Sequence, residues 1–390
     1  MNNGKLSRRT FIRKASMATA GTVAGALAGK GRVSAKAVDK TTKIDTSKIL
    51  NYKPKMHYRR LGKTDLMISE VSLGGHWRAP WRNSGGGWWW AKSITNGISD
   101  KIAKNRTDVV SKAIDCGMNY LDITGAEECI AFGTALKGRR NKMIVGADDS
   151  KLCPRHDEFC NVKAQVHNVE ECLRNIGTDY LDIWRIQAKM DGTNTDADVE
   201  MMIEAFRKLH KAGKVLHLGI SSHSRPWARH VIEKYPQVEM FILPCTAKTK
   251  EKGIPPVRNN IEEQNPGAEP VAKSVFQSLA DNDVGLITIK PFFGGRLLKT
   301  YDNIKTGPSD KEDNDLVRLT LQCILNLNDA ITAVIPGLST VYEVDNAAKA
   351  SYTRPLGLTA ADKEWLMSKT DQRWALLPQE YIWLHDWQFV

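Results

Sequence analysis

The feature that most constrains the fold of this chain is a repeated alternation of short apolar runs with segments of helical spacing. Near-continuous apolar strands that alternate with helices are typical of a parallel sheet. Eight such units favour an α/β fold, a (β/α)8 TIM barrel, over an open sheet, and no Gly-x-Gly-x-x-Gly follows any run. The strand-like runs are residues 71–74, 118–122, 143–147, 180–187, 215–220, 240–243, 285–290 and 331–335. The clearest helical segments are residues 161–176, 199–212, 226–234, 271–279 and 316–327.

Residues 1–37 have the features of an export signal. They combine the twin-arginine sequence SRRTFI (7–12) with a weakly apolar Ala/Gly stretch and an AKA cleavage site (35–37). This order predicts a twin-arginine (Tat) signal peptide, with the Tat translocase as a partner during export and a periplasmic or other extracytoplasmic location. The alternative is a basic tail without structure.

Removing this segment changes the charge of the chain. Residues 1–37 contain eight Lys and Arg and no Asp or Glu, so the formal net charge falls from +12 to +4 without them. A charge of this size gives little support for nucleic-acid binding. No run of about 18 apolar residues remains, so we expect no membrane span in the mature chain.

The rest of the chain divides into a linker (38–55), the barrel (56–350) and a C-terminal extension (351–390). The extension contains four tryptophans, and we expect it to pack on the barrel or on a second subunit, which leaves a homo-oligomer open. These tryptophans are Trp365, Trp374, Trp383 and Trp387.

Three connections between strand and helix are long, at residues 77–105, 246–269 and 296–313. Loops of this kind lie on the catalytic face of a barrel and are often functional. The first contains Trp88, Trp89 and Trp90, which could stack on a ring-shaped, sugar-like ligand or fold onto the barrel as the core of a lid.

The chain has seven cysteines and no Cys-x-x-Cys, which argues against a zinc ribbon or an iron–sulfur cluster. Cys153 and Cys160 bracket a polar loop and could pair in an oxidising compartment, which the sequence leaves open. Cys116, Cys172 and Cys323 lie on apolar helical faces and are expected in the core.

The order of motifs resembles the aldo/keto reductase family over residues 56–350. The resemblance implies a barrel plugged at its bottom by an N-terminal hairpin, and NADPH-dependent reduction of carbonyls. The motifs that carry it are YRRLGKTDLMISEVSLGG (58–75), AIDCGMNYLDIT (113–124), NIGTDYLDIWRIQ (175–187), GKVLHLGISSHS (213–224), GLITIKPFFGGRLL (285–298) and ITAVIPGLST (331–340).

This family uses an aspartate, a tyrosine, a lysine and a histidine, of which this chain keeps one by position. The resemblance places the aspartate at Asp122, after NYL. No tyrosine occurs in residues 123–128, where one is expected. Asp148 stands at the lysine position and Gln187 at the histidine position. Tyr120 faces the same side as Asp122 but lies two residues deeper, about 6.5 Å along the strand, so it is not a simple substitute.

The exchange of lysine for Asp148 brings two carboxylates onto adjacent strands. Unless it is paired, one of Asp122 and Asp148 should have a raised pKa. Arg185 has the same strand parity as Gln187, which makes it the natural partner. An equally weighted interpretation is a buried network of Asp148, Arg185 and Asp122. Such a network would only replace the charges of the family's usual residues.

The residues expected to bind a dinucleotide are better preserved. The resemblance assigns the nicotinamide amide to the end of the fifth strand, the pyrophosphate to the loop after the seventh, and the adenosine phosphate to the segment after the eighth. Ser339 replaces an arginine that many relatives use for the 2′-phosphate, so NADP and NAD both remain open. The residues are Ser221, Ser222, Lys290, Pro291, Gly294, Gly337, Ser339 and Asn346.

Other polar residues at strand ends are expected to face the mouth of the barrel, together with the residues named above. His76, His223 and Lys290 are candidates for the proton donor in place of the tyrosine. A histidine pair with a carboxylate could bind a metal, although the motifs assign no metal site. Each histidine could equally be a polar rim residue.

The leading hypothesis is an exported, NAD(P)-linked oxidoreductase that acts on the carbonyl or alcohol of a small substrate without the usual tyrosine. The alternative is a barrel that kept the scaffold and lost this chemistry, as a ligand-binding protein or as a non-redox lyase or hydrolase.

Overall fold

The computed structural model describes residues 45–77, 98–251, 273–299 and 310–387. The predicted Tat signal and Trp88 to Trp90 lie outside the described residues, as does most of the three long connections.

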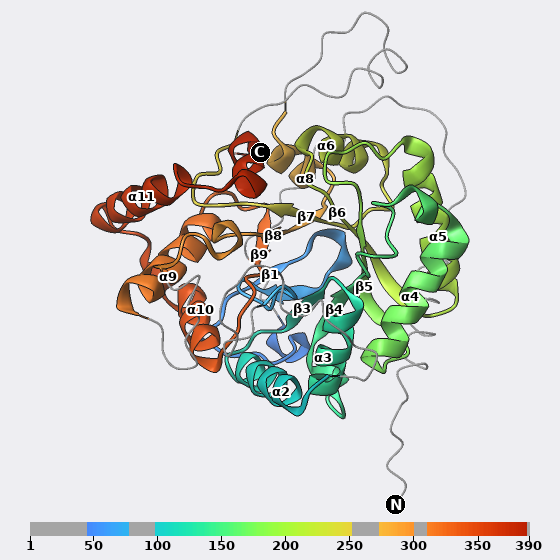
Figure 1. Cartoon of the computed structure of the whole chain (residues 1–390), viewed down its shortest axis with the longest axis horizontal. Coiled ribbons are helices and arrows are strands. Elements are labelled where there is room, and N and C mark those ends of the chain that lie inside the picture. Colours follow the sequence, from blue (N-terminus) through green and yellow to red (C-terminus); the bar gives the residue numbers. More distant parts are fainter. Residues whose placement is uncertain (1–44, 78–97, 252–272, 300–309, 388–390) are drawn as a thin grey trace, which may run out of the picture. The chain divides into compact units, whose positions relative to one another are not determined.

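A curved sheet of seven parallel strands occupies the centre of the fold, with the strands in chain order (Figure 1). They are β3 (Tyr120–Ile123), β4 (Ile144–Ala147), β5 (Leu181–Gln187), β6 (Val215–Ser221), β7 (Met240–Pro244), β8 (Gly285–Ile289) and β9 (Ile331–Val334). This arrangement confirms the predicted parallel barrel.

Residues 71–74 close the sheet between its two edge strands. The N–H of Leu73 donates to the carbonyl of Tyr120 on β3, and the N–H of Ser72 donates to the carbonyl of Val334 on β9. The predicted strand-like run pairs with its two neighbours in turn through single-residue bridges rather than as a continuous strand. It still supplies the eighth position of the barrel.

Helices follow the strands and surround them (Figure 1). They are α2 (Asp100–Asp115), α3 (Ala126–Leu136), α4 (Val162–Ile176), α5 (Asp196–Lys211), α6 (Arg225–Lys234), α8 (Val275–Asp281), α9 (Lys311–Leu325) and α10 (Val341–Thr353). The first long connection is shorter than expected, because the Ser99 side chain accepts from the N–H of Ile102 and begins α2 early.

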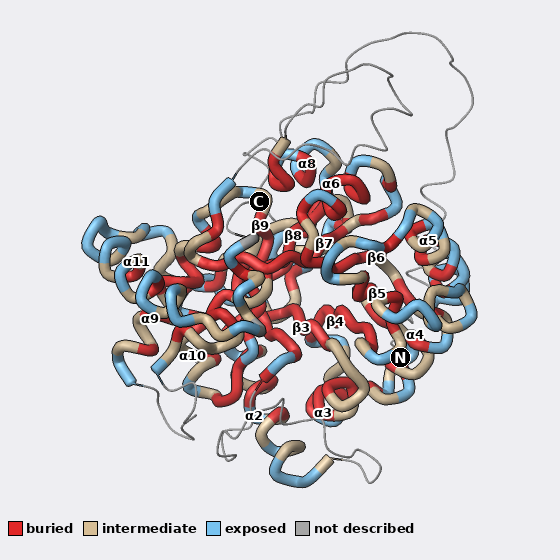
Figure 2. Tube along the Cα trace, turned by 45° about the horizontal axis from the view of Figure 1, so that its top comes forward, coloured by how far each residue is buried: buried red, intermediate tan, exposed pale blue. Residues whose placement is uncertain are grey.

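Two apolar layers hold the barrel together, one inside the sheet and one between the sheet and the helices. The central strands are buried, and the surrounding helices carry the exposed residues (Figure 2). The hairpin of β1 (Tyr58–Arg60) and β2 (Met67–Ser69) contributes Leu61 and Ile68, both fully buried, to the inner layer. These side chains pack with residues such as Tyr120, which confirms the predicted plug at the bottom of the barrel.

The C-terminal residues of the described chain lie against the barrel. α11 (Ala360–Trp374) contacts α9, and the 3-10 segment η8 (Gln379–Trp387) contacts the loop after β8. The rings of Trp374, Tyr381 and Trp383 pack on the outer apolar layer.

The cysteines in the described ranges are all free thiols, Cys153 and Cys160 included. Cys116 and Cys172 are buried as expected, whereas Cys323 is half-buried against a small cluster around Leu366. Among the described residues, no helix has both the length and the apolar character needed to cross a bilayer.

Candidate active site

A cavity of about 470 Å³ opens at the carboxyl ends of the strands. It runs from the centre of the barrel mouth to the N-terminal halves of α9 and α10, where it meets Asp313, Asn314, Glu343 and Asn346. Its size is typical of a small-molecule site. The predicted site residues that line it are His76, Asp122, Gln187, His223, Ser221, Lys290, Pro291, Gly294, Gly337, Ser339 and Asn346.

Ser222 was predicted to bind the cofactor but does not line the cavity. Ser221 is the last residue of β6 and lines the cavity, whereas Ser222 follows the strand and turns away from the cavity. The Ser222 hydroxyl donates to the carbonyl of Lys189 at 2.9 Å, and the side chain is fully buried.

Asp148 is also absent from the cavity lining, and its predicted contact with Arg185 was wrong. Asp148 follows the last residue of β4, where the strand alternation no longer applies. Its carboxylate accepts from Asn168 Nδ2 at 2.9 Å, Trp184 Nε1 at 3.2 Å and the N–H of Gln187 at 2.9 Å. Burial raises the pKa of Asp148 to about 7, although the charge of Arg185 acts against this rise.

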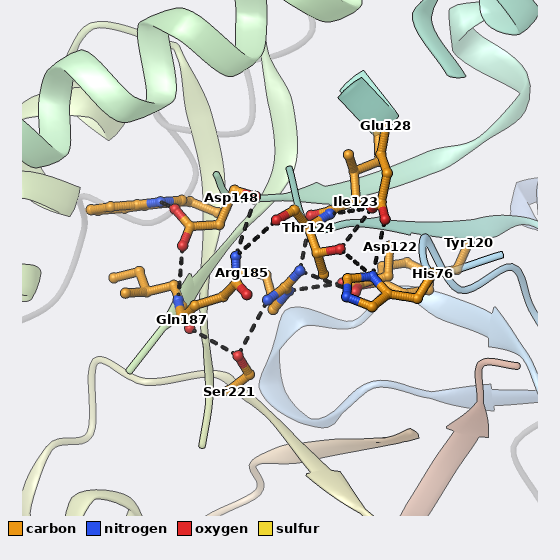
Figure 3. Close-up of polar contacts among 12 residues, drawn as sticks. His76, Tyr120, Asp122, Ile123, Thr124, Glu128, Asp148, Arg185, Gln187 and Ser221 are labelled. Carbon is orange, nitrogen blue, oxygen red and sulfur yellow. Dashed lines mark hydrogen bonds and ion pairs between the residues drawn. The ribbon is translucent and has the colours of Figure 1, made fainter. Parts of the chain in front are cut away.

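Asp122 and Arg185 form a buried ion pair on the inner face of the sheet (Figure 3). Arg185 Nε and Arg185 Nη2 donate to the two oxygens of Asp122 at 2.9 and 3.1 Å. Arg185 also donates to Ser221 Oγ and to the carbonyl of Ile123. Burial raises the pKa of Asp122 while Arg185 opposes the rise, so both carboxylates of the predicted pair have raised pKa values.

The Tyr120 hydroxyl donates to Asp122 Oδ1 at 3.0 Å from below. Its ring is fully buried in the inner apolar layer, and the cavity lining does not include it. Tyr120 therefore fixes the Asp122 carboxylate but does not reach the mouth, as its depth in the strand predicted.

His76, Thr124 and Glu128 converge at one edge of the mouth (Figure 3). His76 Nδ1 lies 3.0 Å from Glu128 Oε1 and 2.6 Å from Thr124 Oγ1. Burial acts to raise the pKa of Glu128, but His76 and the hydrogen bonds from Thr124 lower it below its ordinary value. Glu128 lies in the first turn of α3 as expected, yet its role as a partner of His76 was missed, because it depends on how α3 docks beside residues 74–76.

Lys290 and His223 lie at another edge, next to the C-terminal segment. Burial, with a smaller contribution from the charge of Arg155, lowers the pKa of Lys290 to about 8. Burial and the neighbouring positive charges also lower the pKa of His223 well below its usual value. The ring of Trp383 stacks on His223 at 4.7 Å and lies 5.8 Å from Lys290 Nζ. His223 is therefore neutral near pH 7 and is a poor proton donor.

The loop after β8 approaches other parts of the chain closely. Lys290, Phe293, Gly294 and Gly295 all have positive φ, at 60°, 54°, 68° and 99°. A Cβ on Gly294 would lie 2.4 Å from the Tyr381 hydroxyl, so only glycine fits beside the C-terminal segment. The resulting loop lines the cavity where the resemblance places the pyrophosphate.

The segment after β9 is tightly held. A Cβ on Gly337 would lie 1.6 Å from the carbonyl of His76, which leaves no room for another residue. The carbonyl of Ser339 accepts from Arg106, and its N–H donates to Glu343 Oε2 at 2.6 Å. Asn346 Nδ2 donates to the carbonyl of Asn314 at 2.9 Å, which ties α10 to α9.

Arg155, Arg296 and Tyr381 also line the cavity and were not predicted. Each lies in a loop or in the C-terminal segment, where the sequence has no periodic pattern to indicate an orientation. Among the described residues, no three His, Cys, Asp or Glu side chains are grouped as a metal site.

Comparison with known proteins agrees with the geometry. The model of the aldo/keto reductase family matches residues 85–351. The chain belongs to the aldo/keto reductase family. The uncharacterized oxidoreductase YqkF of Bacillus subtilis is 25% identical over 342 residues, which is 81% of this chain and 97% of that protein.

Solved aldo/keto reductases share this fold. The enzyme AKR11C1 of Bacillus halodurans in its holo form is 20% identical, covers 80% of this chain and 96% of its own, and has a TM-score of 0.53. An aldo/keto reductase of Klebsiella pneumoniae in complex with NADPH is 15% identical, covers 80% and 94%, and has a TM-score of 0.54.

Proposed function

We propose that this aldo/keto reductase interconverts a carbonyl and an alcohol with NAD(P)H, without the usual tyrosine. The observation that carries the proposal is that one cavity contains the Asp122–Arg185 pair and also the loops expected to hold a dinucleotide. A bound nicotinamide would supply the hydride to the carbonyl carbon or accept it from the alcohol.

The residues present fit a dinucleotide along the cavity. Ser221 would contact the nicotinamide amide, the glycine-rich loop around Gly294 the pyrophosphate, and Asn346 the adenosine. Glu343 lines the adenosine end, where a carboxylate suits a ribose 2′-hydroxyl better than a 2′-phosphate. NAD therefore remains as suitable as NADP, even though two structural neighbours are described with NADP or NADPH.

Among the predicted proton donors that line the cavity, Lys290 has the pKa that best suits the role. A pKa of about 8 lets the ammonium give a proton to a carbonyl oxygen near neutral pH. The loss of that proton leaves a neutral amine, which a buried site favours. His223 is too weakly basic for this role, and His76, held by Glu128, is the second choice.

Titration of the purified protein with NADH and NADPH tests the proposal, followed by the pH profile of carbonyl reduction. We expect kcat to fall above about pH 8 and Lys290→Met to lower it by about 10²–10⁴-fold. Lys290→Arg keeps the charge but cannot release a proton in this range, so it should be almost as impaired. Failure of both dinucleotides to bind would reject redox chemistry and favour the alternative of a ligand-binding or non-redox barrel.

We also propose that the chain is exported by the Tat route, since the SRRTFI sequence precedes an apolar stretch and a small-residue cleavage site. A Tat substrate crosses the membrane folded, so the dinucleotide would be loaded before export and retained. Arg8→Lys with Arg9→Lys should leave the full-length chain in the cytoplasm, as fractionation would show. Unchanged location of this variant would contradict the export proposal and leave the redox proposal untouched.

A further inference from the structure

Two of the cationic side chains that line the cavity come from opposite loops. Arg155 lies in the connection between β4 and α4, and Lys290 directly follows β8. Arg155 Nε donates to the carbonyl of Ala188 at 3.0 Å, which fixes the guanidinium at the mouth. Within the described part of the chain, neither the other guanidinium N–H groups nor the Lys290 ammonium have a hydrogen-bond or ion-pair partner.

Neither of the two predicted carboxylates, Asp122 and Asp148, neutralises these charges. Burial lowers the pKa of Arg155 as well as that of Lys290, and the charge of Arg155 lowers the pKa of Lys290 further. Asp122 is already paired with Arg185 through both oxygens. Asp148 attracts Arg155, but it is turned away from the cavity and accepts three other hydrogen bonds.

A pair of half-buried cations with unused donors is costly unless an anion completes it. The planar fork of an arginine matches a carboxylate through two parallel hydrogen bonds. A small anion between the two side chains would offset both their burial and their repulsion.

We infer that Arg155 forms a carboxylate subsite beside Lys290 and that the substrate is a small oxo acid or the matching hydroxy acid. Arg155 holds the carboxylate, and Lys290 faces the carbonyl oxygen to which it gives its proton. The carbonyl part of this inference rests on the proposed function. The carboxylate part can be tested without any turnover.

The experiment measures the binding of two oxo acids, pyruvate and levulinate, and of their neutral counterparts, acetone and 2-pentanone, by ligand-observed NMR. At least one oxo acid should bind about tenfold or more tightly than its neutral counterpart, since a charged hydrogen-bonded pair is added. Arg155→Met should remove this preference, and Arg155→Lys should restore part of it. Lys189→Met is the matched control, because Lys189 pairs with Asp157 and does not line the cavity.

Equal binding of oxo acids and neutral ketones would overturn the inference. Arg155→Met and Lys189→Met losing the preference for oxo acids to the same extent would overturn it too. Much tighter binding of dihydroxyacetone phosphate than of either oxo acid would also overturn it, because the subsite would then be a phosphate site. The same samples are titrated with NADH and NADPH. Oxo-acid binding that depends on Arg155 without any dinucleotide binding would remove the redox proposal and leave the carboxylate subsite in place.

Discussion

Replacing Asp148 with asparagine should remove much of the pH dependence of the stability of the barrel. Asp148 is fully buried, and its pKa is raised from 3.8 to about 7 in the folded chain. Between these values the folded state holds a proton that the unfolded state has lost. Stability therefore falls as pH rises through this window, by about 4 kcal/mol in total at about 1.4 kcal/mol for each pH unit.

The substitution also has a cost that does not depend on pH. An asparagine oxygen can still accept from Trp184 and Asn168, but its amide then faces the N–H of Gln187 and leaves that donor without an acceptor. This costs about 1–3 kcal/mol. We expect Asp148→Asn to be less stable than the wild type at pH 5 and as stable or more stable at pH 8.

Guanidinium chloride unfolding at a series of pH values measures the difference. The free energy of unfolding of the variant, relative to the wild type, should rise by about 3 kcal/mol between pH 5 and pH 8. Asp329→Asn, which changes an exposed carboxylate, is the control and should give a nearly constant difference. If the free energy of unfolding changed with pH in the same way for Asp148→Asn and the wild type, the raised pKa of Asp148 and its assignment to burial would be refuted.

Three further substitutions probe other parts of the structure. Asp122→Ala should lower the free energy of unfolding by about 3–5 kcal/mol, because it leaves Arg185 buried without its carboxylate; a loss under 1 kcal/mol would contradict this. Leu61→Ala should cost about 2–5 kcal/mol by leaving a void in the plug, while ligand binding by the folded fraction stays unchanged. Trp383→Ala should raise the pKa of His223 towards its usual value, and an unchanged midpoint in an NMR titration would show that this ring does not bury it.

The barrel could be predicted because its signals are local. Apolar runs and helical spacing are properties of neighbouring residues, and the eight units follow from them directly. The strand alternation also correctly placed Asp122, Arg185 and Gln187 on one face. The rise along the strand correctly predicted that Tyr120 lies below the mouth of the barrel.

The orientation of side chains beyond the strand ends required the tertiary structure. Asp148 turns towards Trp184 because it lies one residue past β4, where the alternation ends. Glu128 reaches His76 only because α3 docks beside residues 74–76.

The sequence by itself determined the parallel barrel, and its resemblance to the aldo/keto reductases implied the hairpin plug and the retained aspartate. The tertiary structure decided which polar groups meet at the mouth: Arg155 from one loop, Lys290 from another, and Trp383 from the C-terminal segment. The physical reason is that secondary structure follows from local periodicity, whereas the charge and shape of a cavity depend on contacts between residues far apart in the chain.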